Sequence, residues 1–446
     1  MQNPIVYQRL ILKHSSSATQ ILSALAELSH VVYLNDHAQP TIGLFAEEYF
    51  IHQNNETFHY KETNLDTYCA QSIQSLPEFC FQADHTNSSS SFQGGLLGFI
   101  GYDFAASKQV KTAYKTQPAL FIGRFSSYLK YSAEGWTFIS HHPKAKQRYQ
   151  VLLELLNKEN FLPSFKLQQP LQARWSFEQY QQAFHQVQNY IKAGDCYQIN
   201  LTQEFTAKAT GLLLDTASQL WNLTDAPYAG YLRVGEFELL SCSPELFIDF
   251  ESERKLITKP IKGTMPRYAD PILDAESKNT LKASKKDMAE NVMIVDLLRN
   301  DLSVYAEIGT VKTPKLFNIE SFNQVHHMVS EIEARLKNDV NPFGVLMSAL
   351  PGGSITGAPK IRAMQIIEEL EGAPRGAYCG SMGYFNDDGT GSWNILIRSI
   401  QKHQHDVSVW AGGGITIASN CEAEYQECFD KVDAILKLLN TWFQPE

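Results

Sequence analysis

The chain has 446 residues, more than one hydrophobic core usually supports, so we expect one or two large units. Its formal net charge of −10 and the absence of a long run of lysine and arginine argue against a nucleic-acid-binding protein. No 18-residue apolar segment occurs, and the N-terminus lacks a basic region followed by a long apolar stretch. We therefore expect a cytoplasmic protein that does not act in a membrane.

The first part of the chain, residues 1–140, predicts an N-terminal subdomain that is rich in β-strands. Residues 19–29 have the apolar spacing of a helix, whereas alternating and glycine-punctuated segments predict strands. These strands are expected at 31–34, 41–45, 94–103, 120–131 and 136–140.

A helical connector is predicted next, at residues 141–174. It holds a helical stretch at 144–159 and a segment rich in proline and glutamine at 163–173. Ser176, with Gln179 three residues later, has the pattern of a capping box. A helix is therefore expected to begin there and to run to about residue 193.

The third predicted part is residues 175–446, where strands and helices do not alternate regularly. Strands are expected at 196–205, 229–234, 237–241 and 246–250. Long helices are expected at 285–302, 320–336, 359–370 and 422–442. Because regular β-α-β alternation is missing, we predict an α+β fold with antiparallel sheets.

The segment 257–267 places Lys262 between an apolar run and a Gly-Thr turn. A lysine at the end of a strand is usually a solvated surface cation. Two acidic helices and two glycine-rich turns further along the chain suit an enzyme that binds an anionic substrate through a divalent metal ion. In such a site a partly desolvated amine loses its proton more easily, so Lys262 is also a candidate nucleophile.

Two predicted helices carry carboxylates near the residue where each begins. Glu290 precedes the apolar centre of the first helix, and Glu424 and Glu427 share one face of the second. Acidic residues in a first turn also complement the helix dipole, which is the simpler interpretation. One carboxylate from each helix, completed by water and substrate oxygens, is a typical way to hold Mg²⁺.

Two glycine-rich segments offer backbone N–H groups to substrate carboxylates. Residues 351–360 lead into a helix, whose N-terminus attracts anions, but Ala358 stands where a P-loop requires lysine. Residues 411–415 follow a predicted strand and form either a similar anion site or a tight bulge. Between the two segments, Arg398 ends an alternating strand that starts at Ile395, and it is placed to bind a carboxylate with its two-pronged side chain.

These segments together resemble the chorismate-utilising enzymes of the anthranilate synthase component I family. The resemblance is dense over about residues 175–440 and loose over the first 140 residues. The motifs that carry it lie at 194–202, 243–247, 260–264, 287–301, 325–330, 353–360, 375–380 and 422–430. The resemblance implies large antiparallel β-sheets packed as a sandwich with helices outside. It also makes residues 175–446 the chorismate-binding catalytic domain.

Position by position, the resemblance implies roles for individual residues. It implies Mg²⁺ between Glu290 and Glu427, with Glu424 close by, and the ring carboxylate of chorismate on the metal ion. It implies Lys262 as the nucleophile and Glu245 as the general acid or base on the opposite face of the ring. The implied substrate contacts are Tyr378, Arg398, Gly412 and Gly414 at the enolpyruvyl carboxylate, and His327 and Ser354 at the ring and its leaving hydroxyl.

Two positions favour the aminodeoxychorismate synthase branch of this family. Anthranilate synthases normally carry alanine where this chain has Lys262, and isochorismate and salicylate synthases carry a water-activating lysine in the segment that holds Gln198. The implied reaction converts chorismate and ammonia to 4-amino-4-deoxychorismate through a covalent Lys262 intermediate, in 4-aminobenzoate and folate biosynthesis. No Gly-x-Cys-x-Gly turn surrounds any cysteine, so ammonia is expected from a separate glutamine amidotransferase subunit or from solution.

Three other interpretations stay open on the sequence. An anthranilate synthase component I, in tryptophan biosynthesis, would eliminate pyruvate after the amination. A non-catalytic relative would keep the scaffold to bind chorismate or a partner, although the candidate catalytic and metal-binding residues are all present. A nucleotide-binding protein would use the glycine turns, but the P-loop lysine and a G-x-G-x-x-G segment are absent.

Overall fold

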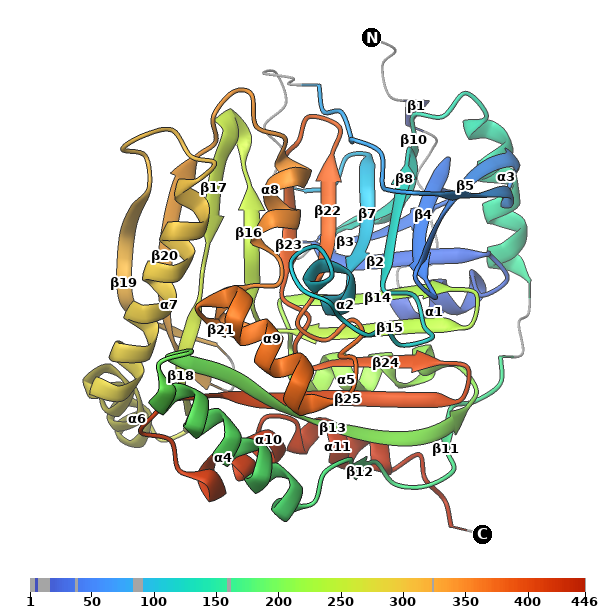
Figure 1. The fold of residues 1–446 in the computed structure, drawn as a ribbon. Helices are drawn as coiled ribbons and strands as arrows, with labels where there is room; N and C mark the ends of the chain where they lie inside the picture. The colour runs from blue at the N-terminus through green and yellow to red at the C-terminus, as the bar shows by residue number, and fades with distance from the viewer. Residues whose placement is uncertain are drawn as a thin grey trace.

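A computed structural model of the chain describes residues 5–6, 17–36, 39–82, 91–158, 162–322 and 325–445. Figure 1 shows two large β-sheets that cross one another, with helices on their outer sides. Neighbouring strands in both sheets run antiparallel. The predicted α+β fold, with antiparallel sheets packed as a sandwich and helices outside, is confirmed.

The first sheet combines strands from both ends of the chain. In spatial order it contains β1 (Ile5–Val6), β10 (Gly135–Ser140), β9 (Ser127–Ser132), β3 (Gln39–Leu44), β2 (His30–Asp36), β14 (Tyr228–Val234), β15 (Phe237–Ser243), β24 (Ser399–His403), β25 (Asp406–Ile415), β13 (Gln198–Thr210) and β11 (Lys166–Leu167). The short strands β12 (Gln172–Ala173) and β21 (Gly357–Ala358) also pair with β13.

The second sheet also combines strands from both ends of the chain. In spatial order it contains β18 (Ile261–Pro266), β20 (Val325–Arg335), β17 (Lys255–Thr258), β16 (Leu246–Phe250), β23 (Gly391–Asn394), β22 (Ser381–Asn386), β7 (Gly95–Ile100), β8 (Leu120–Phe125), β4 (Glu48–Gln53), β5 (Glu56–Asn64) and β6 (Thr67–Ile73). The strand β19 (Lys312–Ser321) pairs with the free side of β20.

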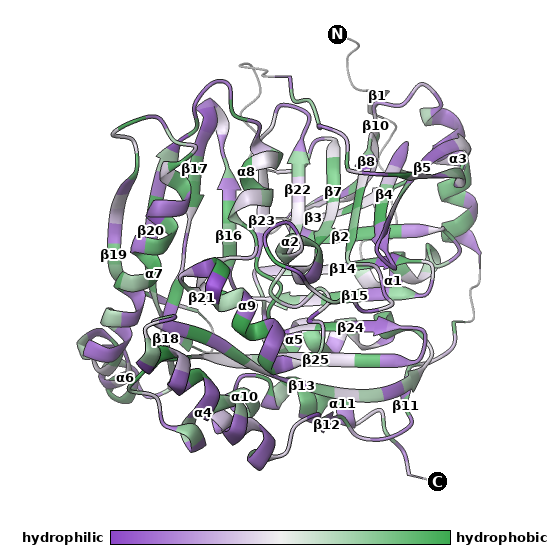
Figure 2. Ribbon diagram, viewed as in Figure 1, coloured by the Kyte–Doolittle hydropathy of each residue, from purple (hydrophilic) through white to green (hydrophobic). Residues whose placement is uncertain are grey.

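Helices lie outside the sheets. They are α1 (Ala18–Ala24), α2 (Tyr102–Ala106), α3 (Ala145–Asn157), α4 (Phe177–Ala193), α5 (Ala217–Thr224), α6 (Pro271–Ala283), α7 (Lys285–Ser303), α8 (Pro342–Ala349), α9 (Lys360–Glu371), α10 (Cys421–Asp430) and α11 (Asp433–Asn440), with 3-10 turns η1 (Leu213–Thr216), η2 (Ser252–Arg254) and η3 (Gly353–Ile355). Figure 2 shows that surface helices such as α4 carry both hydrophilic and hydrophobic segments. None of the described helices is both long enough and apolar enough to cross a membrane.

Alternating residues of the strands fill three buried clusters. In β14, Leu232 belongs to the cluster between the sheets, whereas its neighbour Tyr231 belongs to the cluster under α1, α5 and α11. In β7, Leu97 faces the cluster between the sheets and Leu96 faces the cluster that includes α4, α8 and α9. Successive strand residues point to opposite faces, so this alternation places one apolar layer between the sheets and one on each outer face.

Both sheets are continuous across the predicted boundaries of the chain. The strand β2 pairs with β14, and β7 pairs with β22, so strands from residues 1–140 lie next to strands from residues 175–446. The division at residues 140 and 174 stays a prediction along the sequence.

Several predicted elements are confirmed, and others differ in the structure. The capping box of Ser176 and Gln179 opens α4, and Gly194 ends that helix in a left-handed conformation. The helix predicted at 320–336 is wrong, because β20 occupies that segment and is buried on both faces, which removes the alternation typical of a half-exposed strand. The helix predicted at 422–442 is divided into α10 and α11.

Candidate active site

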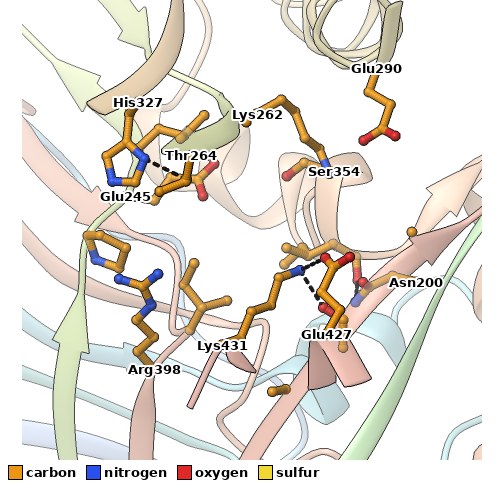
Figure 3. A pocket seen from close by; sticks show the side chains of 18 of the residues that line it. Asn200, Glu245, Lys262, Thr264, Glu290, His327, Ser354, Arg398, Glu427 and Lys431 are labelled. Carbon is orange, nitrogen blue, oxygen red and sulfur yellow. Dashed lines mark hydrogen bonds and ion pairs between the residues drawn. The ribbon is translucent and has the colours of Figure 1, made fainter. Parts of the chain in front are cut away.

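A cavity of about 430 Å³ lies where the β13–β25 edge of the first sheet meets β18, α7 and the turn η3 (Figure 3). Segments that are far apart in sequence contribute its walls. Ten of the predicted site residues line it: Glu245, Lys262, Glu290, His327, Ser354, Tyr378, Arg398, Gly412, Gly414 and Glu427. The structure thus brings together almost all of the predicted set, and the roles of these residues stay predictions.

Glu245 lies on the connection from β15 to β16 and is 8% exposed. Its main chain is fixed on both sides, because its N–H donates to Ser243 Oγ at 3.3 Å and its carbonyl oxygen accepts the N–H of Ile395 at 3.1 Å. Burial raises the pKa of the Glu245 carboxyl to about 7, and the charge of Lys262 opposes that shift. A carboxyl with this pKa can hold or release a proton near neutral pH.

Lys262 stands in β18 at the edge of the second sheet. Lys262 is only partly exposed, and burial of its side-chain amine lowers the pKa of that amine. The charge of Lys431 lowers the pKa further, whereas Glu290, Glu245 and Glu427 raise it. The net shift favours the neutral, nucleophilic form of the amine.

Two carboxylates enter the cavity from different helices. Glu290 projects from α7 beside the buried face of that helix, which includes Ile294, and its side chain is 27% exposed. Glu427 projects from α10 and forms an ion pair at 2.6 Å with Lys431, which also donates to the carbonyl oxygen of Gly412 at 2.7 Å (Figure 3). Burial raises the pKa of Glu427, but Lys431 outweighs it and holds the pKa below its usual value.

Glu424 is the one predicted site residue that does not line the cavity. It is 7% exposed, and its carboxylate accepts a hydrogen bond of 2.7 Å from Ser419 Oγ. Burial raises the pKa of this carboxyl. Its place in the first turn of α10 agrees with a structural role at the helix start.

His327 and Arg398 face the cavity from the side of Glu245 in the view of Figure 3. Burial and the charge of Arg398 lower the pKa of His327 to about 4, so its ring is neutral at neutral pH. Its Nδ1 lies 2.8 Å from Thr264 Oγ1, which leaves Nε2 for another partner. The strand predicted to end at Arg398 is wrong, because the segment is the connection between β23 and β24. Arg398 itself has a positive φ of 51°.

The glycines of the predicted second anion turn lie inside a strand. Gly412 and Gly414 belong to β25 and pair with Thr202 and Asn200 of β13. A Cβ on Gly412 would lie 2.6 Å from the Thr202 side chain, so no larger residue fits without a shift. These glycines therefore allow β13 to lie close to β25. They also leave this wall of the cavity formed by backbone without side chains.

Ser354 and Tyr378 complete the lining of the cavity. Ser354 stands in η3, between α8 and α9, and Tyr378 stands in the turn between α9 and β22. The Tyr378 ring is 4% exposed and stacks on Trp410 with a centroid separation of 5.9 Å and an interplanar angle of 16°. Burial raises the pKa of Tyr378 well above its usual value, so the phenol stays a proton donor.

Comparison with known proteins identifies the family. A family model described as chorismate binding enzyme matches residues 29–437. The chain belongs to the chorismate-binding enzyme family. Aminodeoxychorismate synthase component 1 of Escherichia coli strain K12 is 42% identical to it over 361 residues, which are 79% of this chain and 78% of that protein.

Two solved structures are similar to this chorismate-binding enzyme. Anthranilate synthase component I from Streptococcus pneumoniae TIGR4 has a TM-score of 0.77 at 26% identity, over 89% of this chain and 92% of that one. The menaquinone-specific isochorismate synthase from Escherichia coli has a TM-score of 0.71 at 18% identity, over 98% of this chain and 93% of that one, and so shares the fold.

Two carboxylates of this chorismate-binding enzyme could hold a divalent cation. Glu290 and Glu427 both line the cavity, and both act on the pKa of Lys262 through their charge. Mg²⁺ is typically held by one or two carboxylates together with water and substrate oxygens. Within the described ranges, no cluster of three or more histidine, cysteine, aspartate or glutamate side chains has the arrangement of a metal site.

Other residues of the cavity were not selected from the sequence, among them Lys431, Thr264 and Asn200. Lys431 follows Glu427 by four residues on α10, so the i, i+4 pairing rule could have found it. Thr264 belongs to the Lys-Gly-Thr segment but gave no separate signal. Asn200 lies in β13 and bonds the carbonyl oxygen of Ile355 at 2.9 Å, a contact between distant segments that no local pattern predicts.

Proposed function

We propose that the chain is the chorismate-aminating component of an aminodeoxychorismate synthase, which converts chorismate and ammonia to 4-amino-4-deoxychorismate in 4-aminobenzoate and folate biosynthesis. The observation that carries the proposal is Lys262, which lines the cavity between Glu245 and Glu290 with a lowered pKa (Figure 3). A lysine that is neutral for part of the time attacks carbon, whereas a solvated surface cation does not. Similarity to the Escherichia coli aminodeoxychorismate synthase component 1 supports the same activity.

The first step forms a covalent bond between the enzyme and chorismate. The neutral amine of Lys262 attacks C2, both conjugated ring double bonds shift toward C4, and the bond between C4 and its hydroxyl breaks. The Glu245 carboxyl donates its proton to the departing hydroxyl, which leaves as water. The products of this step are a secondary ammonium on Lys262 and the Glu245 carboxylate.

The second step transfers nitrogen to the ring. Ammonia attacks C4, both ring double bonds shift back, and the bond between C2 and Lys262 breaks to release the neutral amine. The new C4 ammonium gives a proton to the Glu245 carboxylate, which restores both groups. Dividing one awkward displacement into two steps is the advantage of covalent catalysis.

The remaining cavity residues orient the substrate. A magnesium ion held by Glu290 and Glu427 would neutralise the ring carboxylate and act as a Lewis acid. We assign the enolpyruvyl carboxylate of chorismate to the part of the cavity where a guanidinium, a phenol and bare backbone meet. The residues there are Tyr378, Arg398, Gly412 and Gly414. We assign His327 and Ser354 to the ring and its leaving hydroxyl.

Ammonia reaches this cytoplasmic enzyme, in our proposal, from a separate glutamine amidotransferase subunit. Two facts support that partner. The sequence has no Gly-x-Cys-x-Gly nucleophile turn, and two bacterial relatives that are 42% identical to the chain carry the name component 1. The purified chain should use ammonium at alkaline pH, where free NH₃ is available, and should not hydrolyse glutamine.

Product analysis tests the proposal. The chain is incubated with chorismate, ammonium and Mg²⁺, and products are separated and identified by mass spectrometry. The expected product is 4-amino-4-deoxychorismate, which keeps the enolpyruvyl group. Fluorescent anthranilate as the main product would instead identify an anthranilate synthase, and unchanged chorismate would favour a non-catalytic relative.

A further inference from the structure

A buried ion pair lies behind the cavity wall and does not belong to the wall itself. Glu371 is the last residue of α9, and Arg375 follows four residues later, with both side chains 1% exposed. The guanidinium bonds the carboxylate twice, from Nε to Oε2 at 2.8 Å and from Nη2 to Oε1 at 2.7 Å. This two-pronged geometry fixes the plane of the guanidinium.

The remaining donors of Arg375 reach the backbone of two segments that line the cavity. Nη1 donates to the carbonyl oxygen of Ile355 at 3.1 Å, next to Ser354 in η3. Nη2 donates to the carbonyl oxygen of Asn200 in β13 at 2.7 Å. The Asn200 side chain closes the triangle by donating to the same Ile355 oxygen at 2.9 Å. One guanidinium therefore fixes η3 relative to β13.

The Glu371 carboxylate also binds β13, two residues after the contact that Arg375 makes with Asn200. Glu371 Oε1 accepts the N–H of Thr202 at 3.0 Å and the hydroxyl of Thr202 at 2.6 Å. Thr202 is paired with Gly412 across the β13–β25 ladder. The ion pair thus also holds the strand on which the glycine wall of the cavity rests.

The face of the guanidinium stacks against aromatic rings. Its central carbon lies 4.7 Å from the Tyr102 ring centroid and 5.9 Å from that of Tyr378. Tyr378 stacks in turn on Trp410, and both of these rings line the cavity. Stacking on a fixed cation limits the rotation of the Tyr378 ring.

The main chain around Arg375 is fixed as firmly as its side chain. The Asp103 carboxylate accepts the N–H of Arg375 and the N–H of Gly376, each at 3.0 Å. The Gln401 side chain accepts the N–H of Ala377 at 2.8 Å and donates to the carbonyl oxygen of Arg375 at 3.0 Å. The main-chain N–H groups of all three residues before Tyr378 therefore have hydrogen-bond partners.

We infer that the Glu371–Arg375 pair positions the chorismate site by fixing the places of Ser354, Tyr378 and the β13–β25 edge relative to one another. The inference rests on the proposed function. Neither side chain lines the cavity, so both are positioning residues that act through others. Lysine cannot replace the guanidinium, because it lacks a planar set of five donors and a face that stacks on a ring.

Stability alone is a weak reason for such a pair. Replacing a buried ion pair by apolar side chains of similar volume is often neutral or stabilising, whereas removing one partner is strongly destabilising. A pair that serves only stability could therefore be exchanged for neutral side chains without loss of function. A pair that positions substrate groups could not.

Four variants separate these two roles. Arg375→Lys and Glu371→Gln each break the pair, and Glu371→Gln with Arg375→Met removes both charges together. The matched control is Arg148→Lys, because Arg148 is fully buried and paired with Glu62 but bonds no residue of the cavity. Thermal stability, kcat and KM are measured for every variant, and rates are normalised to folded protein.

Arg375→Lys and Glu371→Gln should lower kcat/KM for chorismate by about 100-fold, as expected when reacting groups are misplaced by about 1 Å, with an increase in KM. Arg148→Lys should lose thermal stability but keep the parent kcat/KM. The double variant should regain thermal stability and keep the low kcat/KM. Recovery of kcat/KM together with stability in the double variant would overturn the inference.

Direct binding distinguishes failure of this inference from failure of the proposed function. Chorismate affinity is measured by calorimetry without ammonia. If the parent binds chorismate but forms no 4-amino-4-deoxychorismate, the proposed reaction is wrong, and Arg375→Lys must still weaken binding relative to Arg148→Lys. Equal affinities would overturn the positioning role, and no binding by the parent would overturn both.

Discussion

The two walls of the cavity differ in how firmly the fold holds them. The inner wall, formed by β13, β25 and the turn at 375–378, is almost wholly buried and is held by a long strand ladder. The outer wall, formed by β18 and the first turns of α7, lies at the edge of the second sheet and is partly exposed. Tyr378 on the inner wall is 4% exposed, whereas the Glu290 side chain on the outer wall is 27% exposed.

This difference separates the residues that orient the substrate, on the inner wall, from the charged residues of the outer wall. Isolated charges are costly to bury, so the lysine and the carboxylates of the outer wall and of α10 keep some access to water or to one another. Groups that only orient a substrate need fixed positions, and the inner wall supplies them from backbone and from stacked rings. Changes in the outer wall should therefore remove chemistry at little loss of stability, whereas changes in the inner wall should affect stability as well.

The largest expected effect comes from Lys262→Ala. Without the amine no covalent bond to C2 forms, so only direct amination by ammonia remains. Intact-protein mass spectrometry after quenching with chorismate, in the absence of ammonia, should show an adduct on the parent and none on the variant. Thermal stability should be unchanged, because the side chain is at a sheet edge.

Lys259→Ala is the matched control for that experiment. Lys259 lies three residues earlier, is 37% exposed and pairs with Glu331 outside the cavity. It should keep both the adduct and the parent rate. A parent that never forms an adduct, together with full activity of Lys262→Ala, would show that Lys262 is only a binding cation.

The metal carboxylates should give the next largest effect. Glu290→Gln and Glu427→Gln each remove a charge from the proposed magnesium site at nearly constant volume, so turnover should fall by more than the roughly 10- to 100-fold typical of groups that only support a metal ligand. Calorimetric titration with Mg²⁺ should show weaker binding in both. Glu422→Gln, on an exposed position of α10, is the control and should change neither quantity.

Near-normal Mg²⁺ affinity in both glutamine variants would contradict the assignment. Circular dichroism and thermal denaturation should show an intact fold in each. An unfolded variant would contradict the expectation that changes to these carboxylates remove chemistry at little loss of stability.

The pH dependence of adduct formation tests Glu245. Burial raises the pKa of the Glu245 carboxyl from its usual 4.5 to about 7, so the acid form that protonates the leaving hydroxyl is present below about pH 7 and is lost above it. The rate should therefore fall at alkaline pH, where the acid form of Glu245 is lost, and it should also fall at low pH, because a protonated Lys262 amine cannot attack C2. Glu245→Gln should lower the rate by about 100- to 10,000-fold, the usual contribution of a general acid.

The alkaline decrease is the informative limb of that profile. It should disappear in Glu245→Gln, because the residual rate no longer depends on a titrating acid at this position. Persistence of the same decrease in the variant would show that another group supplies the proton. Measuring the adduct without ammonia keeps the ammonia equilibrium out of the profile.

The smallest effect on chemistry is expected from Gly380→Ala, close to the inner wall. A Cβ at this position would overlap the carbonyl oxygen of Ile100 in the neighbouring strand. The variant should lose about 1–3 kcal/mol of unfolding free energy, as overpacked positions do, measured by urea denaturation. Gly344→Ala in α8 is the control, because its Cβ would meet no atom closer than 3.9 Å, and it should not destabilise the protein.

Much of the candidate site could be predicted because its residues lie in short, chemically distinctive segments. Lys262, Glu290 and Glu427 each stand out locally, through a Lys-Gly-Thr turn or an acidic first turn of a helix, and all three line one cavity. Lys431 and Asn200 could not be selected in the same way, since their importance arises from contacts with Gly412 and Ile355, which are distant in sequence.

The fold was predictable to a similar extent. The capping box at Ser176 is local chemistry and places the start of α4 correctly. The helix α6 was missed although Asp270 caps it and Pro271 begins it, because its apolar stripe is weak and only Ser277 and Leu281 are buried. The error at β20 has the opposite cause, since a strand covered on both faces shows no alternation.

The sequence by itself determined the fold class, the family resemblance and the candidate chemical groups, because composition, caps and short motifs act within a few residues of one another. Only the tertiary structure decided which of those groups meet. It paired Glu424 with Ser419, placed Gly412 and Gly414 inside a strand, and joined Arg375 to Ile355, Asn200 and the Tyr378 ring. These outcomes depend on sheet order and on buried hydrogen bonds between distant residues, which no local pattern in the chain records.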